Sequence, residues 1–371
     1  MKNTKIIIKT SSKTYPIYFG NKIIKSIGLI MQKNLPSVKK VCIIVDKKIP
    51  SKILKELIGS LKKYKTKVYK FTSTEKTKEF SVANKMVEIL IKENFNRSDC
   101  VIALGGGIIG DFSSFVASIT KRGLKFINIP TTLLAQSDSS IGGKTGVNSS
   151  QGKNLIGTFY QPDFVLSDTS TLKSLPKREI ICGYAEILKH ALINDRKFFF
   201  WLSKNANKIL NLSEDKALKF AIMQSSKIKA QIINKDEKEK NIRMTLNFGH
   251  TFAHGFEGAK KFSKTLNHGE AVLMGMMMAS KLAVKKKILS LKEFKLIKQH
   301  YHDLNLPKDF EKKFKKKDIN KIVHFVKKDK KNFNEKINLI FIKKIGLVTR
   351  SGQYKMNVND FKKFLISQSK L

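Results

Sequence analysis

The sequence predicts an α/β domain with a parallel sheet over residues 1–180 and a mainly α-helical domain over residues 181–371. Three observations lead to this division. The length of 371 residues suits two domains better than one. Short β-rich runs alternate with amphipathic stretches in the first half, which implies parallel strands joined by helical crossovers. After Pro176, long stretches in which apolar residues recur at helical spacing dominate.

Six short runs in the first half predict strands because they are rich in β-branched residues. They are Lys5–Lys9, Val41–Val45, Lys67–Phe71, Cys100–Leu104, Phe126–Ile129 and Phe164–Ser167. Amphipathic stretches lie between several of these runs and predict crossover helices at Ser51–Tyr64 and Val82–Asn94.

The second half predicts long helices and one small β element. The helices are expected at Pro176–Ile193, Glu214–Ile233, Asn247–Gly258, Glu270–Lys285 and Val358–Ser367. Two late β-like runs, Ile337–Ile342 and Gly346–Thr349, are separated by a short basic segment and predict a pair of strands.

The formal net charge of +44 is the most unusual number in the composition. Only six of the 73 basic residues are arginine, and the lysines are spread over the whole chain. A nucleic-acid-binding surface usually gathers arginine and aromatic residues on one element. Lys, Ile, Asn and Phe have AT-rich codons, so we attribute the charge to base composition and expect no nucleic-acid partner. A positive field would still attract a small anionic substrate.

Membrane insertion and disulfide bonds are not expected. Apolar stretches such as Ala271–Ala279 are far shorter than the roughly 18–20 residues that span a bilayer, and the N-terminus does not resemble a signal peptide. Cys42, Cys100 and Cys182 are far apart and odd in number, which favours a reducing compartment. We therefore expect a cytoplasmic protein that does not bind membranes.

A glycine-rich turn predicts a dinucleotide site. The string GGGIIGD at residues 105–111 follows the strand Cys100–Leu104 and fits G-x-G-x-x-G at the start of a helix. Its glycines would let backbone N–H groups approach a pyrophosphate. The acid that usually follows about 20 residues later is missing. Because Asp46 ends another predicted strand, we expect loops from several strands to hold the dinucleotide.

Three short patches contain candidate metal ligands. Glu186 and His190 lie four residues apart on a predicted apolar helix, His250 and His254 lie four apart on another, and His268 follows in a third patch. Neutral imidazoles and a carboxylate are suitable ligands for a catalytic zinc ion. The spacing alone leaves open whether His250 pairs with His254 or with His268.

Together these patches resemble the 3-dehydroquinate synthase family of sugar phosphate cyclases, which supplies the second enzyme of the shikimate pathway. The matching strings keep the family's order and include ALGGGIIGD at residues 103–111, SDSSIGGKT at 137–145, YAEILK at 184–189, and the patches around His250 and His268. The resemblance implies the dehydroquinate synthase-like fold, in which a Rossmann-like α/β domain precedes a mainly α-helical one. It also implies a homodimer.

The resemblance further implies which residues form the site. A Zn²⁺ or Co²⁺ ion would be held by Glu186, His250 and His268, and the catalytic residues would be Lys153, Lys189, Arg243 and His254. NAD would contact Asp46, Ser73, Thr74, Glu75, Lys76, Thr77, Lys78, Gly107, Ile108, Ile109, Gly110, Asp111, Thr131, Thr132, Lys144, Lys153, Thr171, Leu172, Lys173 and Ser174. The substrate would contact Arg122, Asp138, Lys144, Lys153, Asn154, Arg243, Asn247, His254 and Lys331 or its neighbour Lys330.

The implied reaction converts 3-deoxy-D-arabino-heptulosonate 7-phosphate into 3-dehydroquinate and phosphate, which makes the enzyme a carbon–oxygen lyase acting on phosphates. NAD⁺ would transiently oxidise a hydroxyl group, phosphate would leave by β-elimination, and reduction, ring opening and an intramolecular aldol closure would follow. The metal would lower the pKa of the alcohol. The chain departs from the family at Ser73-Thr74, where Asp-Gly is usual before Glu75.

Three other functions remain open from the sequence. A metal-dependent polyol dehydrogenase, such as a glycerol dehydrogenase, would release NADH. A related cyclase would make another carbocycle. A basic nucleic-acid-binding protein would show salt-sensitive binding to DNA. The cationic set Arg122, Lys153 and Arg243 suits a substrate with both a carboxylate and a phosphate, which favours the synthase.

Overall fold

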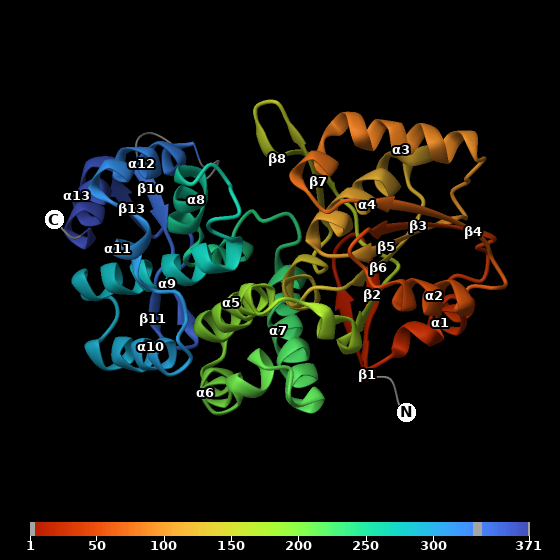
Figure 1. Cartoon of the computed structure of the whole chain (residues 1–371). Coiled ribbons are helices and arrows are strands. Elements are labelled where there is room, and N and C mark those ends of the chain that lie inside the picture. Colours follow the sequence, from red (N-terminus) through yellow and green to blue (C-terminus); the bar gives the residue numbers. More distant parts are fainter. Residues whose placement is uncertain (1–3, 329–335, 370–371) are drawn as a thin grey trace. The chain divides into compact units, whose positions relative to one another are not determined.

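The computed structural model describes residues 4–328 and 336–369, so the expected substrate contacts Lys330 and Lys331 lie outside the described residues. The chain divides into two compact units (Figure 1). The first comprises Met1–Pro176 and Leu212–Glu237, and the second comprises Lys177–Asn211 and Lys238–Leu371. Helix α7 (Asp215–Lys235) therefore belongs to the first unit, although the division expected from the sequence places it after residue 180.

A seven-stranded sheet forms the centre of the first unit, in the order β1-β2-β9-β6-β5-β3-β4. Its neighbours pair in parallel, as the alternation of strands and helices predicts, except that β1 and β2 are antiparallel. The strands are β1 (Thr4–Lys9), β2 (Thr14–Gly20), β3 (Lys40–Asp46), β4 (Lys65–Phe71), β5 (Cys100–Gly105), β6 (Lys125–Pro130) and β9 (Phe164–Asp168).

Helices cover both faces of this sheet (Figure 1). Val41, Ile43 and Val45 of β3 pack into one buried cluster with α1 and α2, whereas Cys42 and Ile44 pack into a second cluster with α3 and α4. Successive side chains of a strand point to opposite faces, so a strand covered on both sides needs the continuous apolar run that β3 has. The helices are α1 (Ile27–Asn34), α2 (Ser51–Ser60), α3 (Phe80–Lys92) and α4 (Gly107–Ile119).

Two further segments of the first unit form strands that the sequence did not predict. They are β7 (Lys144–Ser149) and β8 (Gly152–Phe159), which pair as an antiparallel hairpin. The hairpin packs against α4 and presents mostly exposed side chains along β8. It carries Lys144, Lys153 and Asn154, of which Asn154 has a left-handed backbone conformation with φ 55°.

The second unit is mainly helical, as predicted, and its described residues also form two small strand pairs. The expected strand Ile337–Ile342 is wrong as a single element, because it is divided between β10 and β11. Strand β10 (Lys336–Leu339) pairs with β13 (Tyr354–Asn357), and β11 (Ile342–Lys344) pairs with β12 (Leu347–Val348). The helices are α5 (Lys177–Asn194), α6 (Arg196–Leu210), α8 (His250–Ala259), α9 (His268–Lys285), α10 (Leu291–Asp303), α11 (Phe310–Lys313), α12 (Ile319–Lys327) and α13 (Val358–Gln368).

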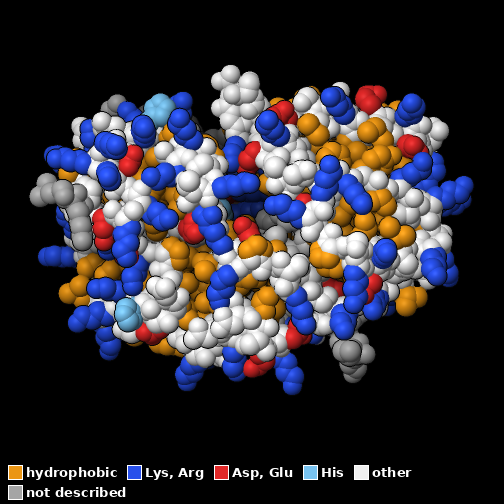
Figure 2. All heavy atoms as spheres, in the orientation of Figure 1, with side chains coloured by type: hydrophobic (Ala, Val, Ile, Leu, Met, Phe, Trp, Pro, Cys, Tyr) orange, Lys and Arg blue, Asp and Glu red, His pale blue; other side chains and the backbone are white. Residues whose placement is uncertain are grey.

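The surface carries the charge expected from the composition. Lys and Arg side chains are scattered over the face shown in Figure 2, and Asp and Glu side chains are far fewer there. Among the described helices, none combines the length and the apolar character needed to cross a lipid bilayer. The three cysteines are free and buried.

We expect added salt to raise the melting temperature of this protein. With a net charge of +44, like charges repel one another in the folded protein and destabilise it. Raising the ionic strength from roughly 0.01 M to 1 M shortens the Debye length from about 30 Å to about 3 Å, which screens this repulsion. Thermal unfolding followed by circular dichroism in increasing NaCl is the measurement, with a neutral osmolyte as the control. A melting temperature that falls or stays constant with NaCl would contradict this expectation.

Glu237, the last residue of the first unit, binds the β1–β2 turn. Its carboxylate accepts hydrogen bonds from the hydroxyl groups of Ser11 and Ser12, from the backbone N–H of Ser12 at 3.0 Å and from Nε2 of Gln161 at 2.7 Å. Burial would raise the pKa of Glu237, but these hydrogen bonds lower it to about 2 from an ordinary value of 4.5.

Replacing this carboxylate should therefore cost stability at neutral pH but not in acid. A pKa depressed on folding stabilises the protein above pH 4.5, and this stabilisation is lost as the pH falls towards 2. We expect Glu237→Gln to lower the free energy of unfolding by about 1–3 kcal/mol at pH 7, with the difference from the wild type shrinking below pH 4.5. Urea unfolding of both proteins across this range measures it, and a difference independent of pH would contradict the assignment.

Candidate functional site

Three side chains from three helices of the second unit direct their ligand atoms at one another. Glu186 lies within α5 and is 1% exposed, and His250 and His268 begin α8 and α9. The Nε2 atoms of the two histidines each lie 3.5 Å from Oε1 of Glu186, and ligand atoms of all three residues lie within 4.8 Å of one another. Two ligands about 2.1 Å from a tetrahedral zinc ion are about 3.4 Å apart. The donor set therefore fits a single divalent metal ion.

Close backbone contacts between the helices bring these residues together. A Cβ on Gly269, which follows His268, would lie 2.2 Å from Cα of Cys182 on α5. A Cβ on Gly275 of α9 would lie 2.2 Å from the carbonyl oxygen of Gly249, the residue before α8. Glycine at both positions lets α9 pack directly against the backbone of its two neighbours, and this packing sets the distances between the three ligands.

The second nitrogen of each imidazole faces an oxygen atom. Nδ1 of His250 lies 3.3 Å from the carbonyl oxygen of Phe248, and Nδ1 of His268 lies 3.4 Å from each carboxylate oxygen of Glu257. Histidines that bind metals usually donate their other N–H group in this way, which fixes the orientation of the ring. Both Nε2 atoms thus remain directed at Glu186.

The two histidines differ in their ionisation. Burial, together with the nearby ammonium group of Lys189, holds the pKa of His250 well below its usual range, so the ring is neutral and able to bind a metal ion. Burial alone would lower the pKa of His268 too, but the carboxylates of Glu257 and Glu186 raise it to about 10. His268 is therefore a cation between two carboxylates, and a divalent metal ion would take the place of the proton on Nε2.

Two expected catalytic residues of the second unit, Lys189 and His254, lie on helices that carry this triad, and Arg243 lies on a short neighbouring helix. Lys189 forms an ion pair with Glu186 and is buried. The ring centroid of His254 lies 5.6 Å from that of His250, one helical turn earlier. Arg243, which is 2% exposed, and Asn247 belong to the short helix Ile242–Asn247, which packs against α5.

The first unit gathers the expected dinucleotide contacts at one edge of its sheet. The parallel strands β3, β4, β5 and β6 end in register, with Asp46 beside Phe71 and Gly105 beside Pro130. The chain continues from β3 to β4 on one side and from β5 to β6 on the other, so the strand order reverses between β3 and β5. Open α/β sheets bind nucleotides in the crevice at such a reversal. Gly107 begins α4 at this point, so the N–H groups of its first turn are available to a phosphate.

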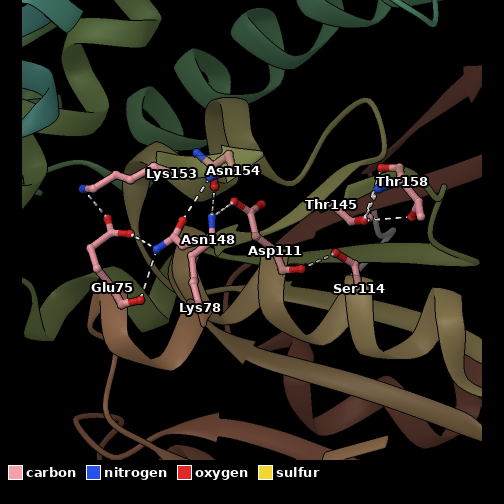
Figure 3. A network of polar contacts seen from close by, with 9 residues as sticks. All are labelled: Glu75, Lys78, Asp111, Ser114, Thr145, Asn148, Lys153, Asn154 and Thr158. Atoms are coloured by element: carbon pink, nitrogen blue, oxygen red, sulfur yellow. Dashed lines mark hydrogen bonds and ion pairs between the residues drawn. The ribbon is translucent and has the colours of Figure 1, made fainter. Parts of the chain in front are cut away.

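Expected NAD and substrate residues of the first unit form a polar network at this edge (Figure 3). Lys153 of β8 forms an ion pair with Glu75 at 2.7 Å, and Lys78 forms one with Asp111 at 2.7 Å while donating a hydrogen bond to Asn154. Burial opposes ionisation of Glu75, but hydrogen bonds from Lys153 and its neighbours lower its pKa. Burial raises the pKa of Asp111 against the effect of Lys78.

Comparison with known proteins decides between the functions left open by the sequence. The family models for the N-terminal and C-terminal parts of 3-dehydroquinate synthase match residues 68–182 and 183–332. The 3-dehydroquinate synthase of Pelagibacter ubique is 50% identical over 356 residues, which are 96% of this chain and 95% of that protein. The chain belongs to the 3-dehydroquinate synthase family. Its members are carbon–oxygen lyases, which places this chain among the enzymes.

Two further relatives extend the comparison. The 3-dehydroquinate synthase of Desulforamulus reducens is 39% identical over 92% of this chain and 94% of its own. A crystal structure of 2-deoxy-scyllo-inosose synthase, complexed with carbaglucose-6-phosphate, NAD⁺ and Co²⁺, covers 98% of this chain and 100% of its own, with 25% identity and a TM-score of 0.86. The dehydroquinate synthase-like fold expected from the sequence is thereby confirmed.

Most residues expected from the synthase family lie at the carboxyl edge of the first unit's sheet, but Arg122 does not. The other residues lie in segments that follow β3, β4, β5, β6 and β9 or in the β7–β8 hairpin. Arg122 follows α4 and precedes β6, so it lies at the amino edge of the sheet. The residues in the first group are Asp46, Ser73, Thr74, Glu75, Lys76, Thr77, Lys78, Gly107, Ile108, Ile109, Gly110, Asp111, Thr131, Thr132, Asp138, Lys144, Lys153, Asn154, Thr171, Leu172, Lys173 and Ser174.

The structure also places two charged residues in contact with expected substrate-binding residues, and the sequence did not predict either of them. Nζ of Lys229 on α7 lies 2.8 Å from a carboxylate oxygen of Asp138 and donates to the backbone oxygen of the same residue at 2.8 Å. Oε1 of Glu239 accepts a hydrogen bond from Asn247 at 3.1 Å. A signal for Lys229 existed in the sequence, because a lysine there interrupts the apolar face of a helix. We find no comparable signal for Glu239.

Proposed function

We propose that this chain converts 3-deoxy-D-arabino-heptulosonate 7-phosphate into 3-dehydroquinate and phosphate, the second step of the shikimate pathway that leads to chorismate and the aromatic amino acids. The observation that carries this proposal is the convergence of Glu186, His250 and His268 in a chain 50% identical to a 3-dehydroquinate synthase. The substrate is a small phosphorylated sugar acid, whose negative charges suit the lysine and arginine residues expected to bind it.

We assign the metal to the triad of the second unit. When bound there, a zinc or cobalt ion polarises hydroxyl oxygens of the substrate and lowers the pKa of the alcohol. Glu186 supplies the carboxylate ligand, and this buried side chain forms an ion pair with Lys189. His250 and His268 supply neutral nitrogen ligands, oriented by Phe248 and Glu257.

We assign NAD to the carboxyl edge of the first unit's sheet. A dinucleotide held there would supply the hydride-transfer chemistry of the reaction. The first turn of α4 presents backbone N–H groups to the pyrophosphate, and Asp46 and Glu75 present carboxylates to ribose hydroxyl groups. Ser73 and Thr74 replace the family's Asp-Gly directly before Glu75, and the carboxylate of Glu75 remains oriented by Lys153 and Asn148.

The remaining charged groups bind substrate and move protons. Arg243 has a planar guanidinium group that can form two parallel hydrogen bonds to a carboxylate or phosphate. Lys144, Lys153 and Asn154 approach from the β7–β8 hairpin. His254 is the proton carrier in this scheme, since an imidazole can act as a general acid and a general base.

A phosphate-release assay with the heptulosonate phosphate tests the function. We expect phosphate release without net formation of NADH, and we expect a chelator to abolish it. A steady rise in absorbance at 340 nm with simple polyols would instead support a polyol dehydrogenase. Phosphate release from other sugar phosphates alone would support a related cyclase.

We also propose that the enzyme is a cytoplasmic homodimer. Arg122 lies at the amino edge of the sheet, opposite the edge where the other expected residues of the first unit gather, so we infer that it acts at the substrate site of a second copy. Sedimentation velocity measures the assembly. Mixing inactive Arg122→Ala with inactive Glu186→Gln should restore activity if Arg122 acts across the interface, and no recovery in a confirmed mixed dimer would contradict this role.

A further inference from the structure

Glu257 is a half-buried carboxylate on the helix that carries two histidines of the site. It lies seven residues after His250 on α8 and three after His254, so all three side chains project from one face of this helix. The Glu257 side chain is 17% exposed, and both of its carboxylate oxygens lie 3.4 Å from Nδ1 of His268. A contact to both oxygens centres the carboxylate on the ring nitrogen.

The imidazole of His268 therefore lies between two carboxylates. Its Nε2 faces Glu186, the proposed metal ligand, at 3.5 Å, and its Nδ1 faces Glu257. His250 differs, because its Nδ1 faces the neutral backbone carbonyl of Phe248. A carboxylate that accepts the second N–H of a metal-binding histidine makes the ring a stronger metal ligand and fixes its tautomer, whereas a carbonyl oxygen only orients the ring. The two histidines are thus unequal ligands.

His268 needs this support more than His250 does. The side chain of His268 is 33% exposed, compared with 13% for His250, so packing restricts its ring less. His268 is also the first residue of α9, so its backbone N–H has no partner within the helix. An acceptor at Nδ1 therefore helps to direct Nε2 towards Glu186.

We propose that Glu257 is a positioning residue for the metal centre: it accepts the Nδ1–H of His268 and directs Nε2 at the metal. The proposal rests on the metal triad assigned under the proposed function. It predicts that loss of the Glu257 carboxylate weakens metal binding by about 10–100-fold, while the folded protein persists. Because Glu257 touches neither metal nor substrate in this scheme, activity at saturating metal should fall much less than metal affinity.

The test compares Glu257→Gln and Glu257→Ala with the wild-type full chain. The dissociation constant for Zn²⁺ is measured by competition with a chromophoric chelator, and the Co²⁺-loaded proteins are compared by their visible absorption bands. We expect Glu257→Gln to bind more weakly than the wild type, since an amide keeps an acceptor but loses the charge, and Glu257→Ala to bind more weakly still. The Co²⁺ bands should shift in both variants.

Glu293 offers a matched control. Its side chain is 13% exposed and lies in the same unit, but it pairs with Arg196 at 2.7 Å and accepts from the backbone of Ile345. Glu293→Gln should lower the melting temperature and leave the affinity for Zn²⁺ unchanged. A structural role for Glu257 would likewise move the melting temperature of the metal-free protein but not the Zn²⁺ affinity or the Co²⁺ bands.

Failure of this proposal can be told apart from failure of the proposed function. If the wild type binds one equivalent of Zn²⁺ and Glu186→Gln loses it, the triad stands. Unchanged affinity in both Glu257 variants would then overturn the positioning role alone. If the wild type binds no stoichiometric metal, the triad itself is overturned, and with it both proposals.

Discussion

Glu186→Gln is expected to abolish metal retention and to lower activity by at least about 10³-fold, because a bound metal ion contributes several kcal/mol to the stabilisation of the reacting oxygens. The carboxylate is 1% exposed, and Oε1 is the atom that both Nε2 atoms approach at 3.5 Å. The uncharged amide oxygen of a glutamine in its place is a weaker metal ligand. Metal content after gel filtration, measured by atomic emission, together with phosphate release, gives the result.

Loss of charge at this position also affects folding, so a second variant is needed. Lys189 is buried beside Glu186, and removing the partner of a buried charge destabilises proteins by about 3–5 kcal/mol. Glu186→Asp keeps the charge opposite Lys189 and only withdraws the oxygen from the histidines. We expect Glu186→Asp to melt close to the wild type in the metal-free form but to bind Zn²⁺ weakly. Normal turnover and retained zinc in both variants would refute the ligand assignment.

The sequence could name the candidate ligands but could not select among them. Glu186, His250, His254 and His268 lie in short patches whose residue types suggest a metal site. The spacing of His250 and His254 on one helix suits a metal site as well as the combination of His250 with His268 does. The distances to Oε1 depend on how α9 packs against its neighbours, and this packing is tertiary information. Resemblance to a family supplied the choice that local periodicity could not.

Elements were missed where local signals conflict with the final structure. Pro16 argues against a strand at the position of β2 because it lacks a backbone N–H. The pairing of β2 with β9 begins only at Ile17, so Pro16 removes no hydrogen bond between these two strands. Helix α6 was overlooked although Asp195 caps it, accepting a hydrogen bond from the backbone of Phe198 at 2.9 Å. The hairpin β7–β8 is rich in glycine and polar residues, and its strands are stabilised by packing against α4 rather than by their own composition.

Gly269→Ala is the substitution expected to show that backbone contact creates the metal site. The added Cβ would lie 2.2 Å from Cα of Cys182 and 2.7 Å from its carbonyl oxygen. Both are backbone atoms, which cannot rotate away as a side chain could, so α9 must move relative to α5. Alanine improves helix propensity by about 1 kcal/mol, and overpacking costs typically 1–3 kcal/mol or more, so we expect net destabilisation.

The same movement displaces His268, the residue directly before Gly269, and should therefore weaken Zn²⁺ binding as well. Gly59→Ala provides the matched control, because Gly59 lies in a helix and an added Cβ there meets nothing within 4 Å. That control should melt at the same or a slightly higher temperature, because alanine restricts the unfolded chain more than glycine does and stabilises the protein by about 0.4–1 kcal/mol. Its Zn²⁺ affinity should be unchanged. Chelator competition and thermal unfolding on both variants measure the two effects. If Gly269→Ala bound Zn²⁺ as tightly as Gly59→Ala, the convergence of the three ligands would not depend on the approach of α9 to α5.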